Sequence, residues 1–221
     1  MRPRDEKNRA VPRTSTALVP VPLVPELSLH LVTGPVGLFD LTGGEFRSAE
    51  PPPFWAFVWA GGQALARYVL DNPALVAGRS VLDIATGSGI AAIAAARAGA
   101  EQVHAIDVDP AAAAAAQRNA AANGVAITAA RADVGDAGWA DVILAGDVFY
   151  SRSVAERMTA YLRGAARAGS RVVVGDPGRG YFPERLFVRV AEYVVPVPAA
   201  LEQAETLVTG VWEIPATSGR G

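Results

Sequence analysis

The sequence predicts an α/β fold in which helices cover both faces of a mostly parallel, doubly wound sheet that ends in an antiparallel hairpin. First, short β-branched or apolar segments alternate with longer segments of helical spacing between residues 80 and 175. Second, the valines at 172–174 are typical of a strand buried on both faces. Third, strand-like segments at 186–195 and 206–214 are separated only by Pro196-Val197-Pro198 and a polar stretch, which indicates the hairpin.

Size and composition indicate one domain. Of the 221 residues, 51% are hydrophobic, which suffices for one substantial core but not for two. We expect a flexible basic tail at 1–15, a covering segment at 16–50, the main domain at 51–215 and a flexible tail at 216–221. The net charge of −2 gives no reason to expect nucleic-acid binding, and the absence of cysteine fits a reducing compartment, here the cytoplasm.

An apolar stretch at 17–24 follows the basic N-terminus. Pro20 and Pro22 interrupt it and Pro25 follows, so it cannot form the helix of a secretion signal or a membrane span of about 20 residues. We therefore expect no membrane partner. The next segment, 26–41, alternates loosely and predicts a strand pair or an irregular covering segment.

Helices and strands follow in order. The first helix is predicted at 63–70, before the breaker Asn72-Pro73. Asp109 and Pro110 are a typical start for a helix at 110–123, which Asn123-Gly124 ends. The other predicted elements are a strand beginning at 81, strands at 103–108, 125–130, 142–144 and 171–175, and helices at 90–98 and 153–168.

The stretch from Val81 to Gly89, Val-Leu-Asp-Ile-Ala-Thr-Gly-Ser-Gly, indicates a ligand site. An apolar run ends abruptly in two glycines, and an alanine-rich helix begins at Ile90, so the stretch predicts a strand, a tight turn and a helix. Because Gly87 and Gly89 have no side chains, the backbone can turn sharply and a ligand can approach it. The N-terminus of the helix presents free N–H groups to that ligand.

Carboxylates follow nearly every predicted strand, at the edge where ligands of open α/β sheets bind. Asp107 lies 18 residues after Gly89 at a strand end, where an acid can accept hydrogen bonds from both hydroxyls of a ribose. Asp133 and Val134 offer a carboxylate and a backbone group to an adenine. The remaining strand ends carry Gly146, Asp147, Tyr150 and Asp176.

The glycine turn leaves two cofactor classes open. Gly87-x-Gly89-x-x-Ala92 satisfies the dinucleotide-binding pattern, so a nicotinamide-dependent oxidoreductase remains an alternative. Three features favour another nucleotide-like ligand: Asp83 within the strand, Asp133 for an adenine, and a tryptophan-rich segment before the strand. A non-catalytic binding module is a further alternative.

At these residues the sequence resembles the class I S-adenosylmethionine-dependent methyltransferases. The stretch 81–89 is similar to their glycine-rich motif I, and Asp107 to their ribose-binding acid. Asp147-Val148-Phe149-Tyr150 matches the Asp-x-x-Tyr signature of the seven-β-strand protein lysine methyltransferases. The resemblance implies a seven-stranded, Rossmann-like methyltransferase sheet.

A narrower resemblance covers roughly residues 50–215. The segments at 57–65, 67–68, 70–73, 146–150 and 175–179 resemble the electron transfer flavoprotein β-subunit lysine methyltransferases, and the last two segments are much more specific than the glycine turn. Ala60 departs from the pattern of this family, which usually has proline there, and nothing before about Pro51 matches.

The resemblance implies S-adenosylmethionine as the cofactor, and Asp147 and Tyr150 as catalytic residues facing its methyl group. No cluster of His, Cys or carboxylates has metal-ligand spacing, so we expect no metal. The implied cofactor-binding residues are Trp59, Asp83, Thr86, Gly87, Ser88, Gly89, Asp107, Asp133, Val134 and Gly146.

The implied reaction is lysine N-methylation of a protein, with the electron transfer flavoprotein β subunit as the acceptor. A small amine, or another protein such as a ribosomal one, remains an alternative acceptor. Asp176 and Arg179 follow the strand at 171–175, and two roles stay open for them: a clamp within their own loop, or contact with the substrate.

Overall fold

The structure is a computed structural model that describes residues 16–32, 53–202 and 204–215. The predicted tails at 1–15 and 216–221, and the part of the covering segment at 33–50, lie outside the described residues.

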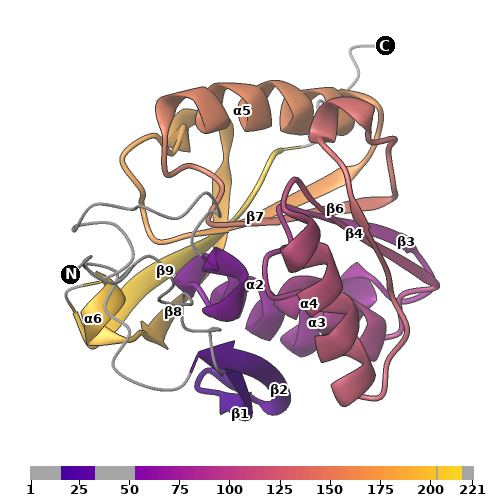
Figure 1. Ribbon diagram of the computed structural model, residues 1–221. Helices are drawn as coiled ribbons and strands as arrows, with labels where there is room; N and C mark the ends of the chain where they lie inside the picture. The colour runs from indigo at the N-terminus through magenta and orange to yellow at the C-terminus, as the bar shows by residue number, and fades with distance from the viewer. Residues whose placement is uncertain (1–15, 33–52, 203, 216–221) are drawn as a thin grey trace, which may run out of the picture.

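The sheet has seven strands in the order β5-β4-β3-β6-β7-β9-β8 (Figure 1). The first five of these run parallel to one another, and β9 pairs antiparallel with both β7 and β8. The mostly parallel sheet with a C-terminal hairpin is therefore confirmed. The strands are β3 (Ser80–Ile84), β4 (Gln102–Asp107), β5 (Thr128–Arg131), β6 (Val142–Gly146), β7 (Arg171–Asp176), β8 (Val188–Pro196) and β9 (Thr206–Glu213).

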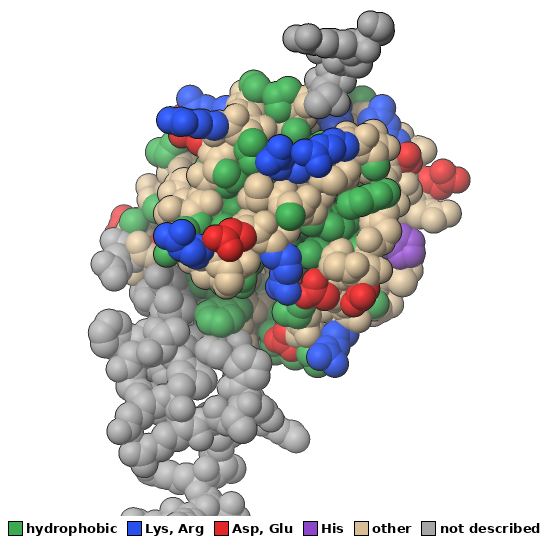
Figure 2. Space-filling view, turned by 90° about the horizontal axis from the view of Figure 1, so that it is seen from above, with side chains coloured by type: hydrophobic (Ala, Val, Ile, Leu, Met, Phe, Trp, Pro, Cys, Tyr) green, Lys and Arg blue, Asp and Glu red, His purple; other side chains and the backbone are tan. Residues whose placement is uncertain are grey.

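Helices cover both faces of the sheet, as Figure 1 shows. One face carries α5 (Arg152–Arg167), and the other carries α2 (Ala60–Asp71), α3 (Ile90–Arg97) and α4 (Pro110–Ala122). Each face has its own apolar core, centred on Leu65, Ile93 and Leu144 on one side and on Phe149 and Leu162 on the other. The outer surface above α5 mixes basic, acidic and apolar side chains (Figure 2).

The helix ends follow from capping residues that the sequence displays. Asp109 accepts a hydrogen bond from the N–H of Ala111 at the start of α4, and Gly124 leaves its end with a φ of +68°. Val125 donates its N–H to the carbonyl of Ala120 as part of this exit. Val125 therefore belongs to the helix end, and β5 begins at Thr128 rather than at 125 as predicted.

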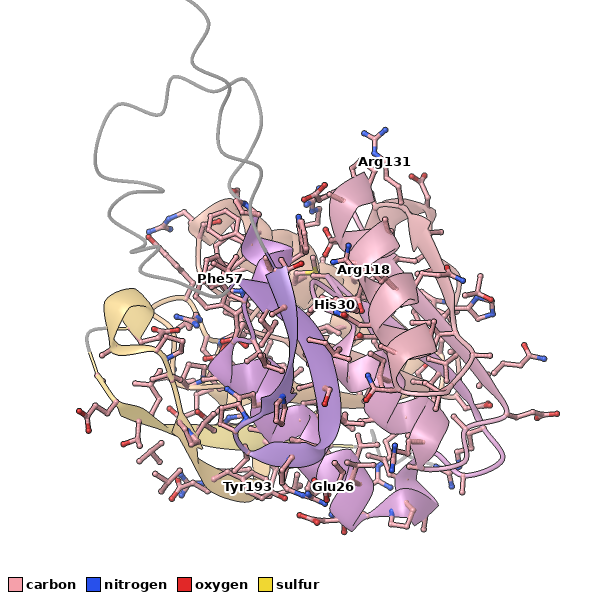
Figure 3. All side chains as sticks on the ribbon, turned by 60° about the horizontal axis from the view of Figure 1, so that its bottom comes forward. Glu26, His30, Phe57, Arg118, Arg131 and Tyr193 are labelled. Carbon is pink, nitrogen blue, oxygen red and sulfur yellow. The ribbon has the colours of Figure 1, made fainter. Side chains whose placement is uncertain are left out.

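An antiparallel pair, β1 (Thr16–Val21) and β2 (Val24–Val32), precedes the main sheet. The sequence predicts a strand pair or an irregular covering segment at 26–41. A strand pair is present but begins at Thr16, and residues 33–41 lie outside the described residues. Leu27, Leu29 and Leu31 form one buried face of β2, because an extended backbone places every second residue on the same side. Figure 3 shows the pair lying against α4, with His30 beside the helical turn that carries Arg118.

A short helix, α6 (Ala199–Glu202), lies between β8 and β9, where the sequence predicts only a polar stretch.

The side chain of Gln63 in α2 is fully buried. It accepts a hydrogen bond from the N–H of Leu23 and donates one to the carbonyl of Pro196. Gln63 thus ties the N-terminal strand pair to the C-terminal hairpin. Within the described ranges, no helix is both long and apolar enough to cross a membrane.

Candidate active site

Five parallel strands bring their carboxyl ends to one edge of the sheet. Nearly all the predicted site residues lie at or after these strand ends, so the fold gathers them along that edge. Trp59 reaches the same edge because it precedes α2, whose first turn lies close to β6. A Cβ added to Gly146 would stand 3.0 Å from the nitrogen of Gly62.

The turn between β3 and α3 is built by two glycines in the left-handed region. Gly87 has a φ of +52° and Gly89 one of +85°. A Cβ on Gly89 would lie 2.8 Å from the Cα of Ala116, so α4 packs directly on the turn. A Cβ on Gly87 would meet nothing within 4 Å, so this side of the turn is open to a ligand.

Asp83, predicted to bind the cofactor, is buried beneath this turn and only 2% exposed. Its Oδ2 accepts hydrogen bonds from the hydroxyl of Thr86 at 2.6 Å and from the N–H of Ala92 at 3.2 Å. Burial raises the pKa of Asp83 to about 7, against the lowering effect of these two bonds. Asp83 and Thr86 therefore brace the turn against α3 from below.

Asp107, at the end of β4, stands beside the open side of the turn. Its Oδ2 accepts the N–H of Gly87 and its Oδ1 the N–H of Asp109, both at 3.0 Å. Burial raises the pKa of Asp107, and the two main-chain hydrogen bonds oppose that rise. The acid is thus fixed next to the turn, where the sequence predicts a ribose acceptor.

Asp133 and Val134 follow β5. The Asp133 carboxylate accepts the N–H of Gly135 at 2.9 Å and pairs with Arg157 at 2.7 Å. Val134 is buried at the start of a short 3-10 helix, η3 (Val134–Asp136). An adenine that contacted the Asp133 carboxylate would therefore compete with Arg157. The carbonyls of Asp133 and Val134 accept the N–H groups of Asp136 and Ala137, whereas the N–H of Val134 donates no hydrogen bond within the described residues.

Asp147 follows β6 and is held from two sides. Its Oδ2 accepts a hydrogen bond from the N–H of Gly62 at 2.9 Å, and its Oδ1 accepts one from Nη2 of Arg179 at 2.8 Å. Burial raises the pKa of Asp147 to about 6, although the charge of Arg179 lowers it. Asp147 also has a φ of +55°, which is costly for a residue with a side chain and is typical of functional sites.

Phe149 and Tyr150, two and three residues further on, point to different environments. Phe149 is fully buried, with its ring 5.3 Å from that of Phe182 and 6.1 Å from that of Phe187, and so anchors the loop in the core. Tyr150 is 63% exposed at the rim of the site. Phe149 thus fixes the loop in the core, while the ring of Tyr150 stays exposed beside the site.

Known proteins match this chain over most of its length. The family model "Ribosomal protein L11 methyltransferase (PrmA)" matches residues 64–148. The electron transfer flavoprotein beta subunit lysine methyltransferase of Danio rerio is 40% identical over 199 residues, which cover 86% of this chain and 76% of that protein. The Homo sapiens protein of the same name is 33% identical over 199 residues, which cover 86% and 75%. This chain belongs to the electron transfer flavoprotein beta subunit lysine methyltransferase family.

This methyltransferase family assignment agrees with the fold. The solved ribosomal protein L11 methylase of Lactobacillus delbrueckii subsp. bulgaricus superposes with a TM-score of 0.52 at 21% identity, covering 87% of this chain and 97% of its own. At that identity the likeness concerns the fold alone. The family resemblance and the seven-stranded methyltransferase sheet that the sequence predicts are both confirmed.

One residue that the sequence analysis missed in this methyltransferase is Asn119 of α4. It is fully buried, donates to the carbonyl of Ser88 at 2.8 Å and accepts the N–H of His30 at 2.8 Å. It therefore joins the N-terminal strand pair to the glycine turn. A signal existed: Asn119 is the one polar residue on the face of α4 that its buried alanines define.

Two further partners had no signal in the sequence. The N–H of Gly62 lies 85 residues before Asp147 in the chain, and Glu202 pairs with Arg179 from the unpredicted helix α6. Asp176 accepts the main-chain N–H of Arg179 but does not pair with its guanidinium. In the described part of the chain, no group of three or more His, Asp or Glu residues has the arrangement of a metal site.

Proposed function

We propose that this methyltransferase transfers methyl groups from S-adenosylmethionine to lysine side chains of the electron transfer flavoprotein β subunit. The observation that carries the proposal is the buried Asp147 carboxylate, fixed at the same sheet edge as the open glycine turn. A carboxylate there is suited to receive a cationic acceptor beside a nucleotide-like cofactor.

The residues at the glycine turn fit this cofactor. Gly87 leaves open space at the turn, Asp107 offers its carboxylate to a ribose, and the N–H of Val134 suits an adenine. Trp59 lies beside Arg179, which pairs with Asp147, and Gly146 directly precedes Asp147. When bound, S-adenosylmethionine supplies a methyl group bonded to a positively charged sulfur. This sulfur is the leaving group when an amine attacks the methyl carbon in line.

The acceptor amine must be neutral to attack. With an unperturbed pKa near 10.4, a lysine is only about 0.1% neutral at pH 7.4, a cost of roughly 4 kcal/mol. A nearby carboxylate raises an amine's pKa further. Asp147 therefore binds and orients the incoming ammonium rather than removing its proton. The proton leaves to water, and holding the amine in near-attack geometry supplies the rest.

Tyr150 is proposed to contact the acceptor. It is exposed at the rim, three residues after Asp147 in a loop that Phe149 anchors in the core. An aromatic ring there covers the methylene groups of an entering lysine and excludes water from the amine.

A ribosomal protein remains the second candidate acceptor. It is favoured by the matching L11 methyltransferase family model, which ends at residue 148 and so excludes Tyr150 and Arg179. That match concerns the cofactor half of the site more than the acceptor half. The absence of cysteine agrees with an enzyme acting in the cytoplasm.

The test is incubation of the enzyme with S-adenosylmethionine labelled in its methyl group and with three acceptors: the flavoprotein β subunit, ribosomal protein L11 and a small amine. We expect label on lysines of the flavoprotein β subunit. Label on L11 alone would replace the acceptor. Calorimetry should detect S-adenosylhomocysteine binding and no NAD binding; the reverse result would reject the methyltransferase proposal.

A further inference from the structure

The loop after β7 is shaped to turn Arg179 back across the strand ends. Asp176 accepts the N–H of Gly178 at 2.8 Å and of Arg179 at 2.7 Å through the same oxygen. Gly178 has a φ of +86°, which closes the turn. The backbone of Arg179 is thereby fixed before its side chain makes any contact.

The guanidinium of Arg179 joins three elements of the site. Nε and Nη2 donate to Oδ1 of Asp147 at 3.2 and 2.8 Å, and Nη2 also donates to Oε1 of Glu202 at 2.9 Å. The group lies over the ring of Trp59, 5.7 Å from its centroid. The side chains of Asp147 and Glu202 are 10% and 13% exposed and that of Arg179 20%, so water screens these charges little.

The charges around Asp147 do not balance. Asp176 faces it from the end of β7, Glu202 approaches through Arg179 from α6, and the first turn of α2 contributes only the uncharged N–H of Gly62. Among the described residues, Arg179 is the cation that contacts Asp147. Three carboxylates thus lie around one guanidinium that pairs with two of them, Asp147 and Glu202. Oδ2 of the buried Asp176 has no hydrogen-bond partner among the described residues.

We propose that Arg179 is a positioning residue for methyl transfer: it keeps the buried Asp147 ionised and fixed, so that the carboxylate can receive the acceptor's ammonium. This inference rests on the proposed role of Asp147. The negative excess of the cluster favours entry of a second cation, because one guanidinium does not neutralise three carboxylates. Glu202 and Trp59 hold the guanidinium from the other side when that cation arrives.

The charge of Asp147 depends on Arg179. Burial and the neighbouring Asp176 push the pKa of Asp147 up, while the charge and hydrogen bonds of Arg179 and the N–H of Gly62 hold it near 6. Without the guanidinium, the pKa of Asp147 rises further, since the charge and the hydrogen bonds of Arg179 no longer lower it. A protonated Asp147 has no charge with which to attract an ammonium.

The experiment compares Arg179→Met and Arg179→Gln, both neutral, with Arg179→Lys, which keeps the charge. Arg189→Met is the matched control, because Arg189 also pairs with a glutamate, Glu192, and lies 5.7 Å from a tryptophan ring, but on the hairpin. The first readout is the titration of the Asp147 carboxyl carbon by ¹³C NMR in free protein, assigned with Asp147→Asn. The second is the pH dependence of kcat/KM with the flavoprotein β subunit.

We expect the Asp147 titration to move up by about 1.5 to 2 pH units in both neutral variants. Their kcat/KM then falls about four- to tenfold at pH 7 and returns close to wild type at pH 9, because the ionised fraction of Asp147 recovers. Arg179→Lys and Arg189→Met keep the wild-type midpoint within about half a unit. Arg179→Gln retains a hydrogen-bond donor and provides a second neutral variant if Arg179→Met does not fold.

An unchanged Asp147 titration in the neutral variants would overturn the inference. So would a loss of kcat/KM that is uniform from pH 6 to 9, which is the result of a purely structural role. If the wild-type protein methylates no acceptor, the proposed function fails, but the NMR titration needs no acceptor and still decides what Arg179 does to Asp147.

Discussion

The N–H of Gly62 donates a hydrogen bond to Oδ2 of Asp147 at 2.9 Å, although 85 residues separate them. The residue at the N-cap of α2, Trp59, makes no side-chain cap, so Asp147 satisfies a free N–H of this helix from another part of the chain. The contact requires close packing of backbones: a Cβ on Gly61 would lie 2.2 Å from the carbonyl oxygen of Gly175. The glycines of α2 therefore set the position of the proposed catalytic carboxylate.

The close approach of Gly61 to Gly175 is tested by Gly61→Ala. The added Cβ forces α2 away from β7, so the free energy of unfolding should fall by about 2–3 kcal/mol in urea titrations, with loss of turnover. Gly138→Ala is the control, since a Cβ there meets nothing within 4 Å and should change stability by less than about 0.5 kcal/mol. Equal free energies of unfolding in the two variants would show that α2 can move away from β7 without loss of stability.

The role of Asp107 at the glycine turn is tested by Asp107→Ala. The variant removes the acceptor of the Gly87 N–H and the proposed ribose acceptor, so affinity for S-adenosylhomocysteine should fall about 10- to 100-fold by calorimetry. Asp109→Ala removes only the N-cap of α4 and should cost about 1 kcal/mol of stability with affinity kept. A larger loss of affinity in Asp109→Ala would contradict the assignment.

The buried Asp83 predicts a pH dependence of stability. Its pKa is raised to about 7 in the folded protein, so between about pH 4 and pH 7 the folded state binds a proton that the unfolded chain has released. Stability from this group is therefore full below about pH 4 and falls as pH rises to 7. Asp83→Asn should be less sensitive to pH over that range in urea unfolding. A parallel dependence in both proteins would argue that Asp83 is ionised when folded.

The link between the N-terminal strand pair and the glycine turn is tested with two asparagines one helical turn apart. Asn119→Ala should lower the free energy of unfolding by about 2–3 kcal/mol and weaken S-adenosylhomocysteine binding, because Asn119 holds the Ser88 carbonyl. Asn123→Ala loses bonds to Ser28 alone among the long-range contacts, and should lower stability with affinity unchanged. If both variants bind alike, Asn119 does not position the turn.

The local elements were predictable because their signals are local. The start of α4 at Pro110, with its cap at Asp109, and the valines of β7 lie where the sequence predicts them. The ends that differ, such as the start of β5, depend on backbone contacts like that of Val125 with Ala120. The glycine at 124 favours that contact, so the later start of β5 follows from the helix exit.

The candidate site was predictable at its residues but less so at their contacts. Asp107 ends β4 beside Gly87 as the spacing predicts. Asp83 shares the same motif, yet the fold turns it inward, because β3 is buried on both faces and alternate residues of a strand point opposite ways. The partner of Arg179 could not be inferred, because Asp147 and Glu202 come from distant segments that only the tertiary fold brings together.

The proposed role of Asp147, to orient a lysine of the flavoprotein β subunit for methyl transfer, is tested most directly by intact-protein mass spectrometry of that subunit after incubation with this enzyme and S-adenosylmethionine. Wild type should add methyl groups to lysine. Asp147→Ala should do so about 100-fold more slowly while its S-adenosylhomocysteine affinity stays within about threefold of wild type. An unmodified subunit with wild-type enzyme, or undiminished turnover by Asp147→Ala, would contradict the account.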